Sequence, residues 1–332
     1  MLVCPLHAKS ISVSDLTIAA MAATSVILMP NIAVIILTLN EAMHLDRAIQ
    51  SLGPLAKKVI VVDSFSTDET LEIARAHGAT ILQNKFVNHS RQFQWALDNI
   101  EVDCDWIMRL DADEVLQPAL VEEITTKLTT LSPDIVGVNL KRRHVFMGRW
   151  IRRGGRYPLT LLRIWRRGQG RVENRWMDEH IIIWGGDTVT FESDFVDHNL
   201  TDLTFFIDKH NEYATREAID RLNDEFSFFE ADEAVSAGGS SGQARVKRVI
   251  KQRLYNPLPF GVGPVGYFLW RYLVQLGFLD GREGLIYHFL QGYWYRFLVE
   301  AKVLELRRAT CHLSNPAEIK ATLAKLTKLP LE

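Results

Sequence analysis

The chain has 332 residues, of which 47% are hydrophobic and 23% are charged. This composition excludes a globally disordered protein, and the length suits one large domain or a domain with a sizeable appendage. The formal net charge of −2 gives no general reason to expect a nucleic-acid partner. Cys4, Cys104 and Cys311 show neither metal-ligand spacing nor a disulfide framework, which suits a reducing cytosol.

The N-terminal segment carries no charge between Asp15 and Glu41. Pro30 divides this run, and its first half is short for a membrane span and a poor signal peptide because little charge precedes it. Met29 lies just before a strand-like run and is a candidate translation start. Residues 1–30 are therefore expected to be an extension of unknown use.

The segment after residue 30 alternates strands and helices. Apolar runs and helical spacing predict strands at 32–39, 59–63, 79–82 and 105–110, and helices at 45–52, 66–78 and 92–99. Ser66 and Glu69 form a capping-box pattern at the start of the second helix. The alternation predicts a parallel α/β sheet with right-handed crossovers, in which ligands bind beyond the carboxyl ends of the strands.

The character of the sequence changes after residue 200. The pattern predicts a charged helix at 203–229, a loop or linker at 236–242 and an aromatic-rich region at 260–297, which holds twelve of the 32 aromatic residues. Arg271, Asp280 and Arg296 argue against a transmembrane span there, and Pro264 is expected to disrupt its first helix. This region could lie in a membrane interface or pack on the catalytic domain. We therefore expect domains at 31–200 and 201–332.

Acidic residues follow two of the predicted strands. Asp111 and Asp113 come after the fourth strand, and residues i and i+2 of an extended chain project to the same side. Their carboxylates could share Mg²⁺ or Mn²⁺, which would neutralise charge on a departing nucleotide diphosphate. Asp63 ends the second strand, where it could bind a base or a ribose hydroxyl, or instead cap a turn. An Asp-x-Asp pair alone is a weak signal, and its place after a strand strengthens it.

Three motifs in this order resemble the inverting glycosyltransferases of family 2, which have the GT-A fold. They are ILTLNE ending at Glu41, VVDSFSTDET starting at Val61, and RLDADE ending at Glu114. The branch that builds lipopolysaccharide core and exopolysaccharide is similar at 155–158, 163–167, 177–180, 197–200, 209–214 and 277–282. The resemblance covers about residues 32 to 300. It implies metal-dependent transfer from a nucleotide-diphosphate sugar, expected to be a UDP-sugar, to a lipopolysaccharide-core, exopolysaccharide or lipid-linked glycan.

The resemblance also implies roles on the donor side. Thr38, Asn40 and Glu41 would line the nucleotide pocket, Asp63 would hold the base, Asp111 would lie near the ribose and metal, Asp113 would bind the metal directly, and His198 would be a further metal or diphosphate ligand. Family members often carry Arg-Asn in the helix before the fourth strand, where this chain has Phe93-Gln94. Arg91 or Gln92 would then supply the polar contact.

On the acceptor side, the resemblance implies that Glu179 is the general base, with Asp178 as the competing candidate. An inverting transfer is a single displacement that requires one carboxylate to take the acceptor proton. Repulsion between neighbouring acids would raise the pKa of such a base. The alternative is a surface turn before a strand at 180–184.

The stretch from Lys141 to Arg175 contains twelve Lys and Arg residues and one acid, Glu173, a local net charge of +11. It is either a solvated basic face or a surface that meets an anion. Within it, Arg156, Arg163, Arg166 and Arg167 could contact donor phosphates, anionic acceptor sugars or lipid headgroups.

Two other functions fit parts of the sequence. Asp111 could be the nucleophile of a haloacid-dehalogenase-type phosphatase, although three strands precede it and that motif usually opens its domain. A non-catalytic glycan- or membrane-binding protein is the second alternative. The expected location is the cytoplasm, with peripheral contact on the cytoplasmic face of the inner membrane and no nucleic-acid partner.

Overall fold

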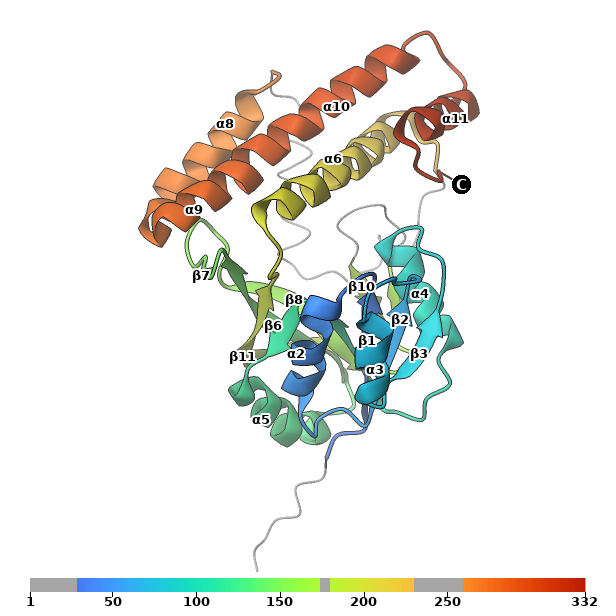
Figure 1. Cartoon of the computed structure of the whole chain (residues 1–332), viewed down its shortest axis with the longest axis vertical. Helices are drawn as coiled ribbons and strands as arrows, with labels where there is room; N and C mark the ends of the chain where they lie inside the picture. The colour runs from blue at the N-terminus through green and yellow to red at the C-terminus, as the bar shows by residue number, and fades with distance from the viewer. Residues whose placement is uncertain (1–28, 174–179, 230–258, 332) are drawn as a thin grey trace, which may run out of the picture.

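The computed structural model describes residues 29–173, 180–229 and 259–331. They form an α/β unit with a layer of C-terminal helices across one end (Figure 1). The main-sheet strands are β1 (Ile32–Thr38), β2 (Lys58–Asp63), β3 (Thr80–Gln83), β4 (Trp106–Asp111), β5 (Glu114–Leu116), β6 (Ile135–Phe146), β7 (Arg149–Trp150), β8 (Leu159–Arg166) and β11 (Asp187–His198). A separate hairpin pairs β9 (Gly170–Val172) with β10 (Ile181–Ile183).

The strand order of the main sheet is β3-β2-β1-β4-β8-β6-β11-β5, with β7 paired to β6. The first four strands are parallel, as the alternating sequence predicts, and β6 and β11 are also parallel. Strand β8 runs antiparallel to both of its neighbours, and β5 runs antiparallel to β11. The fold is therefore α/β with a mixed, mostly parallel sheet. The antiparallel pairs, which depart from the predicted parallel sheet, lie in the second half of the domain.

Helices cover both faces of this sheet. The helices of the α/β unit are α2 (Ala42–Leu52), α3 (Thr70–Ala76), α4 (His89–Asn99) and α5 (Pro118–Lys127), followed by a short turn, η1 (Leu128–Thr130). Apolar residues of α2, α3 and α5 pack with Val34 and Ile36 on one face. Phe93 and Ala96 of α4, together with β9 and β10, pack with Ile35 on the other. Strand β1 is buried on both sides, which explains its continuous apolar run.

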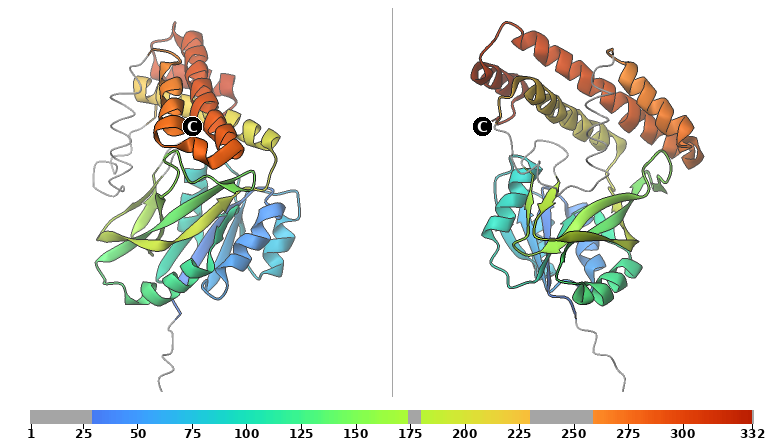
Figure 2. Two further views of the ribbon diagram at one scale, coloured as in Figure 1. Left: turned by 90° about the vertical axis from the view of Figure 1, so that its left-hand side faces the viewer. Right: turned by 180° about the vertical axis from the view of Figure 1, so that it is seen from behind.

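The C-terminal helices form a layer over the carboxyl ends of β1 and β4 (Figures 1 and 2). Its elements are α6 (Leu203–Phe226), α8 (Val262–Leu269), the π-helical η4 (Trp270–Val274), the turn η5 (Gly277–Asp280), α9 (Gly281–Tyr287), the π-helical η6 (His288–Trp294), α10 (Tyr295–Thr310) and α11 (Pro316–Thr327). Ala218, Leu222, Leu306 and Leu323 form the core between α6, α10 and α11. The helical nature expected for 201–332 is confirmed for the described residues.

Two local expectations were wrong. Helix α3 begins at Thr70, and Ser66 does not cap it: the Ser66 hydroxyl donates instead to Asp63, while Asp68 accepts from the Thr70 amide at 3.1 Å. Pro264 does not disrupt the helix that opens the aromatic-rich region. It is the third residue of α8, in the first turn, where a helix does not use the backbone N–H that proline lacks.

Among the described residues, no helix has both the length and the apolar character to cross a membrane. The expected extension 1–30 falls almost entirely outside the described residues, as do Asp178 and Glu179. Residues 199–202 connect the end of β11 to the start of α6, and the domain boundary expected near residue 200 stays a prediction.

Candidate active site

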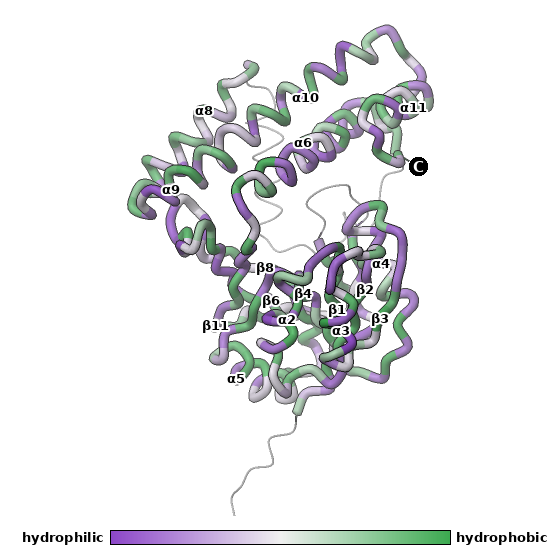
Figure 3. The backbone as a smooth tube through the Cα atoms, viewed as in Figure 1, coloured by the Kyte–Doolittle hydropathy of each residue, from purple (hydrophilic) through white to green (hydrophobic). Residues whose placement is uncertain are grey.

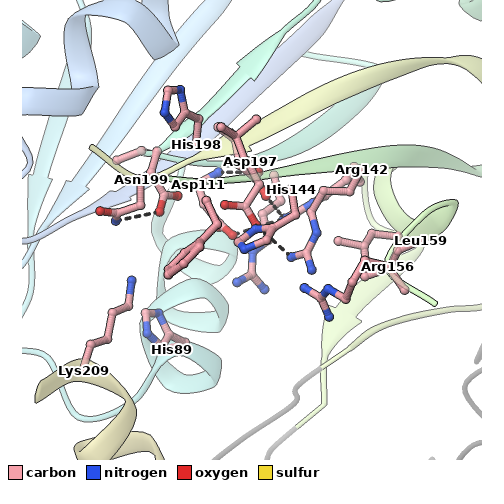
Figure 4. Close-up of a pocket in the computed structure, with 18 of the residues that line it drawn as sticks. His89, Asp111, Arg142, His144, Arg156, Leu159, Asp197, His198, Asn199 and Lys209 are labelled. Carbon is pink, nitrogen blue, oxygen red and sulfur yellow. Dashed lines mark hydrogen bonds and ion pairs between the residues drawn. The ribbon is translucent and has the colours of Figure 1, made fainter. Parts of the chain in front are cut away.

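A cleft of about 900 Å³ lies between the carboxyl end of β4 and the C-terminal helices. Asp111, Asp113 and Arg163 line it from the sheet, Lys209 lines it from α6, and Tyr287 lines it from the end of α9. Figure 4 shows the charged side chains of β4, β6 and β11 converging on this space, with Lys209 facing them from the opposite wall. Residues of the α/β unit and of the C-terminal helices therefore both line the cleft.

Asp111 ends β4 and is held by two arginines. Arg109 Nε donates to Oδ1 and Arg163 Nη2 donates to Oδ2, each at 3.1 Å. Burial raises the pKa of Asp111, but the two guanidinium charges outweigh this effect and hold the pKa well below its usual value. The side chain keeps 37% of its surface exposed, because it lies on the floor of an open cleft. Asp111 is therefore a fixed anion that a ligand can reach.

Glu114 lies beside Asp111 and Arg163. It contacts Arg163, and its Oε2 accepts from the Asp111 amide at 2.9 Å. Its side chain is almost fully buried. Burial and the neighbouring Asp111 charge raise the pKa of Glu114 to about 8, although Arg163 opposes the shift. The Arg163 cation therefore serves two acids, of which Asp111 keeps the negative charge more firmly.

Asp113 has a different environment from Asp111. Its Oδ2 accepts from Asn199 Nδ2 at 3.1 Å, and its carbonyl accepts from the His198 amide at 3.0 Å. Burial and the like charge of Asp197 raise the pKa of the Asp113 carboxyl. For Lys209, burial lowers the pKa, but Tyr213 and Asp113 outweigh it and hold the pKa above its usual value. Lys209 thus stays a cation that faces the Asp113 end of the cleft.

A second charged cluster follows on β6 and β11. Asp197 Oδ2 lies 3.2 Å from Arg142 Nη1 and 3.1 Å from His144 Nδ1. Burial raises the pKa of Asp197, but the charges of His144 and Arg142 lower it further, so its pKa lies below the usual range. Arg156 reaches the same wall, with its guanidinium 5.3 Å from the centre of the Tyr287 ring. Within the described ranges, no carboxylate pairs with Arg156.

The basic stretch is thus partly neutralised inside the protein. Lys141, Arg142 and Arg143 of β6 pair with Glu192, Asp197 and Asp194 of the neighbouring strand β11. Arg163 pairs with Asp111 and Glu114, and Arg166 stacks 4.5 Å over the Trp106 ring. Among the described arginines of this stretch that line the cleft, Arg142 and Arg163 are paired with carboxylates, whereas Arg156 is available to an anion.

The residues expected to hold the nucleotide form a bonded network at the ends of β1 and β2. Asp63 is fully buried and accepts from Thr38 Oγ1 at 3.0 Å, from the Ser66 amide at 2.9 Å and from Gln83 Nε2 at 3.2 Å. Burial raises the pKa of Asp63, but these hydrogen bonds outweigh it and lower the pKa. Asp63 orders the turn after β2, and its contact with a base stays a prediction.

Asn40 and Glu41 continue this network. Asn40 has a positive φ of 56°, and its Oδ1 accepts from the Thr67 amide at 2.8 Å. Glu41 lines the cleft, and its Oε2 lies 2.6 Å from His44 Nδ1. The other ring nitrogen of His44 accepts from the Leu200 amide at 2.9 Å. Glu41 is therefore coupled through His44 to the segment that follows β11.

Arg91 and Gln92 lie apart from the cleft walls. The Arg91 side chain is exposed, and its amide is capped by Asn88. Gln92 is buried, donating to Ser64 Oγ at 3.1 Å and accepting from Asn84 at 2.9 Å. Neither lines the cleft, whereas His89 of the same helix does. Their donor contact stays a prediction.

His198 lines the cleft. The His198 ring lies on the far side of the carboxylates from Lys209 and His89 (Figure 4), and burial and Arg47 lower its pKa. Its role as a metal or diphosphate ligand stays a prediction. Asp178 and Glu179 lie outside the described residues, but the adjacent His180 lines the cleft.

The carboxylates of the cleft determine whether the site suits a divalent cation. No cluster of three or more His, Cys, Asp or Glu side chains that could hold a metal occurs in the described part of the chain. Asp113 offers a half-buried carboxylate of raised pKa, in which one oxygen accepts from Asn199, while both Asp111 oxygens already accept from arginines. Mg²⁺ often binds through one or two carboxylates and completes its shell with water and substrate phosphates. Asp113, with Asp111 beside it, fits that mode.

The structure adds residues that the sequence analysis missed as site residues. These are His89, Arg109, Arg142, His144, Asp197 and Lys209. Arg109 could have been found, because it precedes Asp111 by two positions on a strand and so shares its face. Lys209 lies in the segment 209–214, which resembles the family, but no local spacing connects it with Asp111, because only the tertiary fold brings α6 over β4.

The mixed, mostly parallel sheet with its layer of C-terminal helices is a GT-A-like fold, as the sequence predicts. Residues 33–195 match the sequence profile of Glycosyl transferase family 2, so this part of the chain is a family 2 domain. That match argues against the phosphatase alternative. The chain is 26% identical over 268 residues to a lipopolysaccharide core biosynthesis glycosyltransferase, LpsC, of Rhizobium meliloti, covering 77% of this chain and 88% of that protein.

Other similarities are more local. An uncharacterized glycosyltransferase of Rickettsia bellii is 41% identical over 102 residues, which cover 30% of this chain and 33% of the relative. The chain thus spans about a third of the length of that relative. A crystal structure of glucosyl-3-phosphoglycerate synthase from Mycobacterium tuberculosis, in complex with Mn²⁺, UDP and glucosyl-3-phosphoglycerate, matches with 23% identity and a TM-score of 0.29. That match covers 42% of this chain and 51% of the synthase.

Proposed function

We propose that this protein transfers a sugar, with inversion, from a nucleotide-diphosphate sugar to a lipopolysaccharide-core, exopolysaccharide or other lipid-linked glycan. A UDP-sugar is the favoured donor. The observation that carries the proposal is the arrangement of Asp111 and Asp113 at the end of β4, opposite Lys209 and inside a family 2 domain. The similarity to LpsC over most of both chains supports the class of acceptor.

On the donor side, the protein offers fixed cations and anions before any ligand arrives. Lys209 and Arg109 supply positive charge beside the carboxylates, which favours a diphosphate in this part of the cleft. Asp113, assisted by Asp111, would hold Mg²⁺ or Mn²⁺, which neutralises charge on the leaving diphosphate when bound. Thr38, Asn40, Glu41 and Asp63 would shape the nucleotide end, the last mainly by ordering the turn after β2.

On the acceptor side, Glu179 would take the proton of the attacking hydroxyl, with Asp178 as the alternative. His180, the next residue in the sequence, lines the cleft, which supports the proposal. Inversion requires the acceptor to attack from the side opposite the leaving diphosphate. Arg156, on the wall formed by β8 and Tyr287, would meet an anionic group of the acceptor.

We further place the protein in the cytoplasm, in peripheral contact with the inner membrane, where a lipid-linked acceptor is presented. The defining experiment is binding and hydrolysis of a panel of nucleotide sugars by the purified chain, with and without Mn²⁺ or Mg²⁺. We expect metal-dependent binding of one UDP- or GDP-sugar. Cleavage of a phosphate ester without binding of any nucleotide sugar would overturn the proposal.

A further inference from the structure

The segment from Val262 to Trp294 is a helical hairpin whose polarity is inverted. Its buried side carries Arg271, Asp280 and His288, which keep at most 5% of their surface exposed. Its solvent side carries large apolar residues instead. We call these the outer face: Val262, Val265, Leu269, Trp270, Leu273, Val274, Leu276, Phe278, Leu279, Leu285 and Phe289. A helix pair facing water normally shows the opposite arrangement.

The spacing of the outer face is regular. Val262, Val265, Leu269 and Leu273 follow one another at intervals of three or four residues through α8 and η4, and their exposed fractions lie between 45% and 52%. Leu285 and Phe289 are four residues apart on the returning segment, which packs against α8. In Figure 3, green hydrophobic stretches occur along α8 and beside α9, at the edge of the molecule. Exposed apolar residues therefore recur at helical spacing on both packed segments of the hairpin.

The buried polar residues explain why the hairpin has this orientation. Arg271 Nε donates to the Gly154 carbonyl at 2.9 Å, and Asp280 Oδ2 accepts from the Arg153 amide at 2.7 Å. The Gly154 amide in turn donates to the Gln275 carbonyl at 3.0 Å. These bonds dock the loop between β7 and β8 onto the hairpin. The protein thus fixes the hairpin through its polar side and leaves the apolar side outward.

Basic side chains border the outer face. Arg152 and Arg153 are exposed and lie with Gln275, at the end of η4, around a shallow pocket of about 390 Å³. Arg282 is exposed on α9, three residues before Leu285. The acids of the hairpin do not cancel this charge, because Asp280 is buried and Glu283 lies 3.6 Å from another arginine, Arg149. The border is therefore cationic.

We propose that the outer face inserts into the surface of an anionic lipid bilayer, with Arg152, Arg153 and Arg282 on the phosphate headgroups. An apolar helical face bordered by arginines matches the boundary between acyl chains and anionic headgroups. A second copy of the chain fits this surface less well, because a two-fold contact would bring two arginine borders of the same charge together.

The same hairpin connects the membrane to the cleft. Tyr287 and Gln291 line the cleft, whereas Leu285 and Phe289 of the same segment belong to the outer face. A glycan attached to a lipid could therefore reach the cleft without its anchor leaving the bilayer. This last consequence rests on the proposed function, whereas bilayer insertion itself does not depend on sugar transfer.

The test is partitioning of the full chain onto phosphatidylcholine vesicles with and without phosphatidylglycerol. The double variant Trp270→Glu/Leu273→Glu should lower the partition coefficient at least about tenfold, because two apolar anchors become charged. Leu326→Glu is the matched control, since Leu326 is 51% exposed on α11 and is outside the hairpin. It should bind as the wild type does. Arg152→Gln and Arg153→Gln should each weaken binding about fivefold, and only on anionic vesicles.

A second measurement covers the case in which the double variant does not fold. Leu273→Cys, labelled with an environment-sensitive fluorophore after serine replaces Cys4 and Cys311, should shift its emission to the blue on anionic vesicles. Leu326→Cys with the same label should not. The proposal would be overturned if the wild type did not partition onto vesicles, or if the folded double variant bound them equally well. It would also be overturned if the wild type formed a dimer and did not bind vesicles, and the double variant dissociated that dimer.

The two proposals fail separately. Vesicle binding without transfer or donor hydrolysis would count against the glycosyltransferase chemistry and leave the outer face assigned. Donor hydrolysis by a chain that ignores vesicles would count against bilayer insertion and leave the chemistry assigned. The double variant should retain donor hydrolysis, because none of the outer-face residues lines the cleft.

Discussion

Arg163 of β8 and Asp111 of β4 are joined at 3.1 Å across two adjacent antiparallel strands, and the same guanidinium nitrogen also contacts Glu114. Arg163 is 6% exposed, whereas Asp111 opens onto the cleft. The pair therefore joins the buried Arg163 cation to the Asp111 anion, which a ligand can reach. It also connects the centre of the sheet with the charge that a donor would meet.

Arg163→Met should destabilise the protein by about 3–5 kcal/mol, because it leaves two acids at a buried site without their shared cation. Urea unfolding measures this change. Arg152→Met is the control, since that side chain is exposed and should change stability by less than about 0.5 kcal/mol. Adding Glu114→Gln to the first variant should recover part of the loss. Equal stability of both single variants would contradict the buried role of Arg163.

Glu114 should make stability depend on pH. Its pKa of about 8 in the folded protein lies above the unfolded value of 4.5, so the folded state binds the proton more tightly between these limits. The contribution of Glu114 to the free energy of unfolding is complete below about pH 4.5 and is lost as the pH rises to about 8. The slope of this free energy is at most about 1.4 kcal/mol per pH unit.

The comparison of wild type with Glu114→Gln isolates this slope, because the buried histidines are common to both. Unfolding free energies should be measured from acid to mildly alkaline pH. The difference between the two proteins should change across this window and become constant above it. A difference that does not vary with pH would show that Glu114 is already ionised in the folded protein.

Asp113→Asn should lower kcat/KM by about a hundredfold or more, because an amide binds a divalent cation more weakly than a carboxylate does. The substitution preserves the shape of the side chain that contacts Asn199. Donor hydrolysis over a titration of Mn²⁺ measures the effect, with Glu192→Gln, at an exposed position of β11, as the control. Full activity of Asp113→Asn in the presence of a chelator would rule out the metal role.

Glu179→Gln should leave donor binding intact and reduce kcat by about 10²–10⁴-fold, the range expected for loss of a general base. Asp178→Asn should have a smaller effect. Single-turnover transfer and nucleotide binding should be measured on both variants. If Asp178→Asn alone stops transfer, the neighbouring residue is the base.

Gly154→Ala should be more destabilising than Gly148→Ala by about 1–3 kcal/mol. Both glycines have positive φ, 65° and 76°, so both substitutions carry the same type of backbone strain. Only at Gly154 would the new Cβ lie 2.2 Å from Cε1 of the buried His288, whereas nothing lies within 4 Å at Gly148. Thermal unfolding of the two variants checks the docking of this loop on the hairpin.

Local patterns in the sequence were enough to predict the first half of the fold. The apolar run of β1, the acid at the end of β2 and the Asp-x-Asp pair after β4 are short-range signals, and parallel strands place their carboxyl ends together. The order of these motifs also indicated the family, which the match over residues 33–195 bears out. By contrast, the local capping pattern at Ser66 misled, because Asp63 competes for the same hydroxyl.

The sequence by itself thus determined the parallel core, the acidic edge and the helical character of the C-terminal region. Only the tertiary structure decided which charges are cancelled and which remain. Acids on β11, about fifty residues away in the sequence, neutralise the charges of Lys141, Arg142 and Arg143. Lys209 lies opposite Asp113 because α6 packs over the end of β4. The physical reason is that ion pairs and burial depend on distance in space, which periodicity along the chain does not specify.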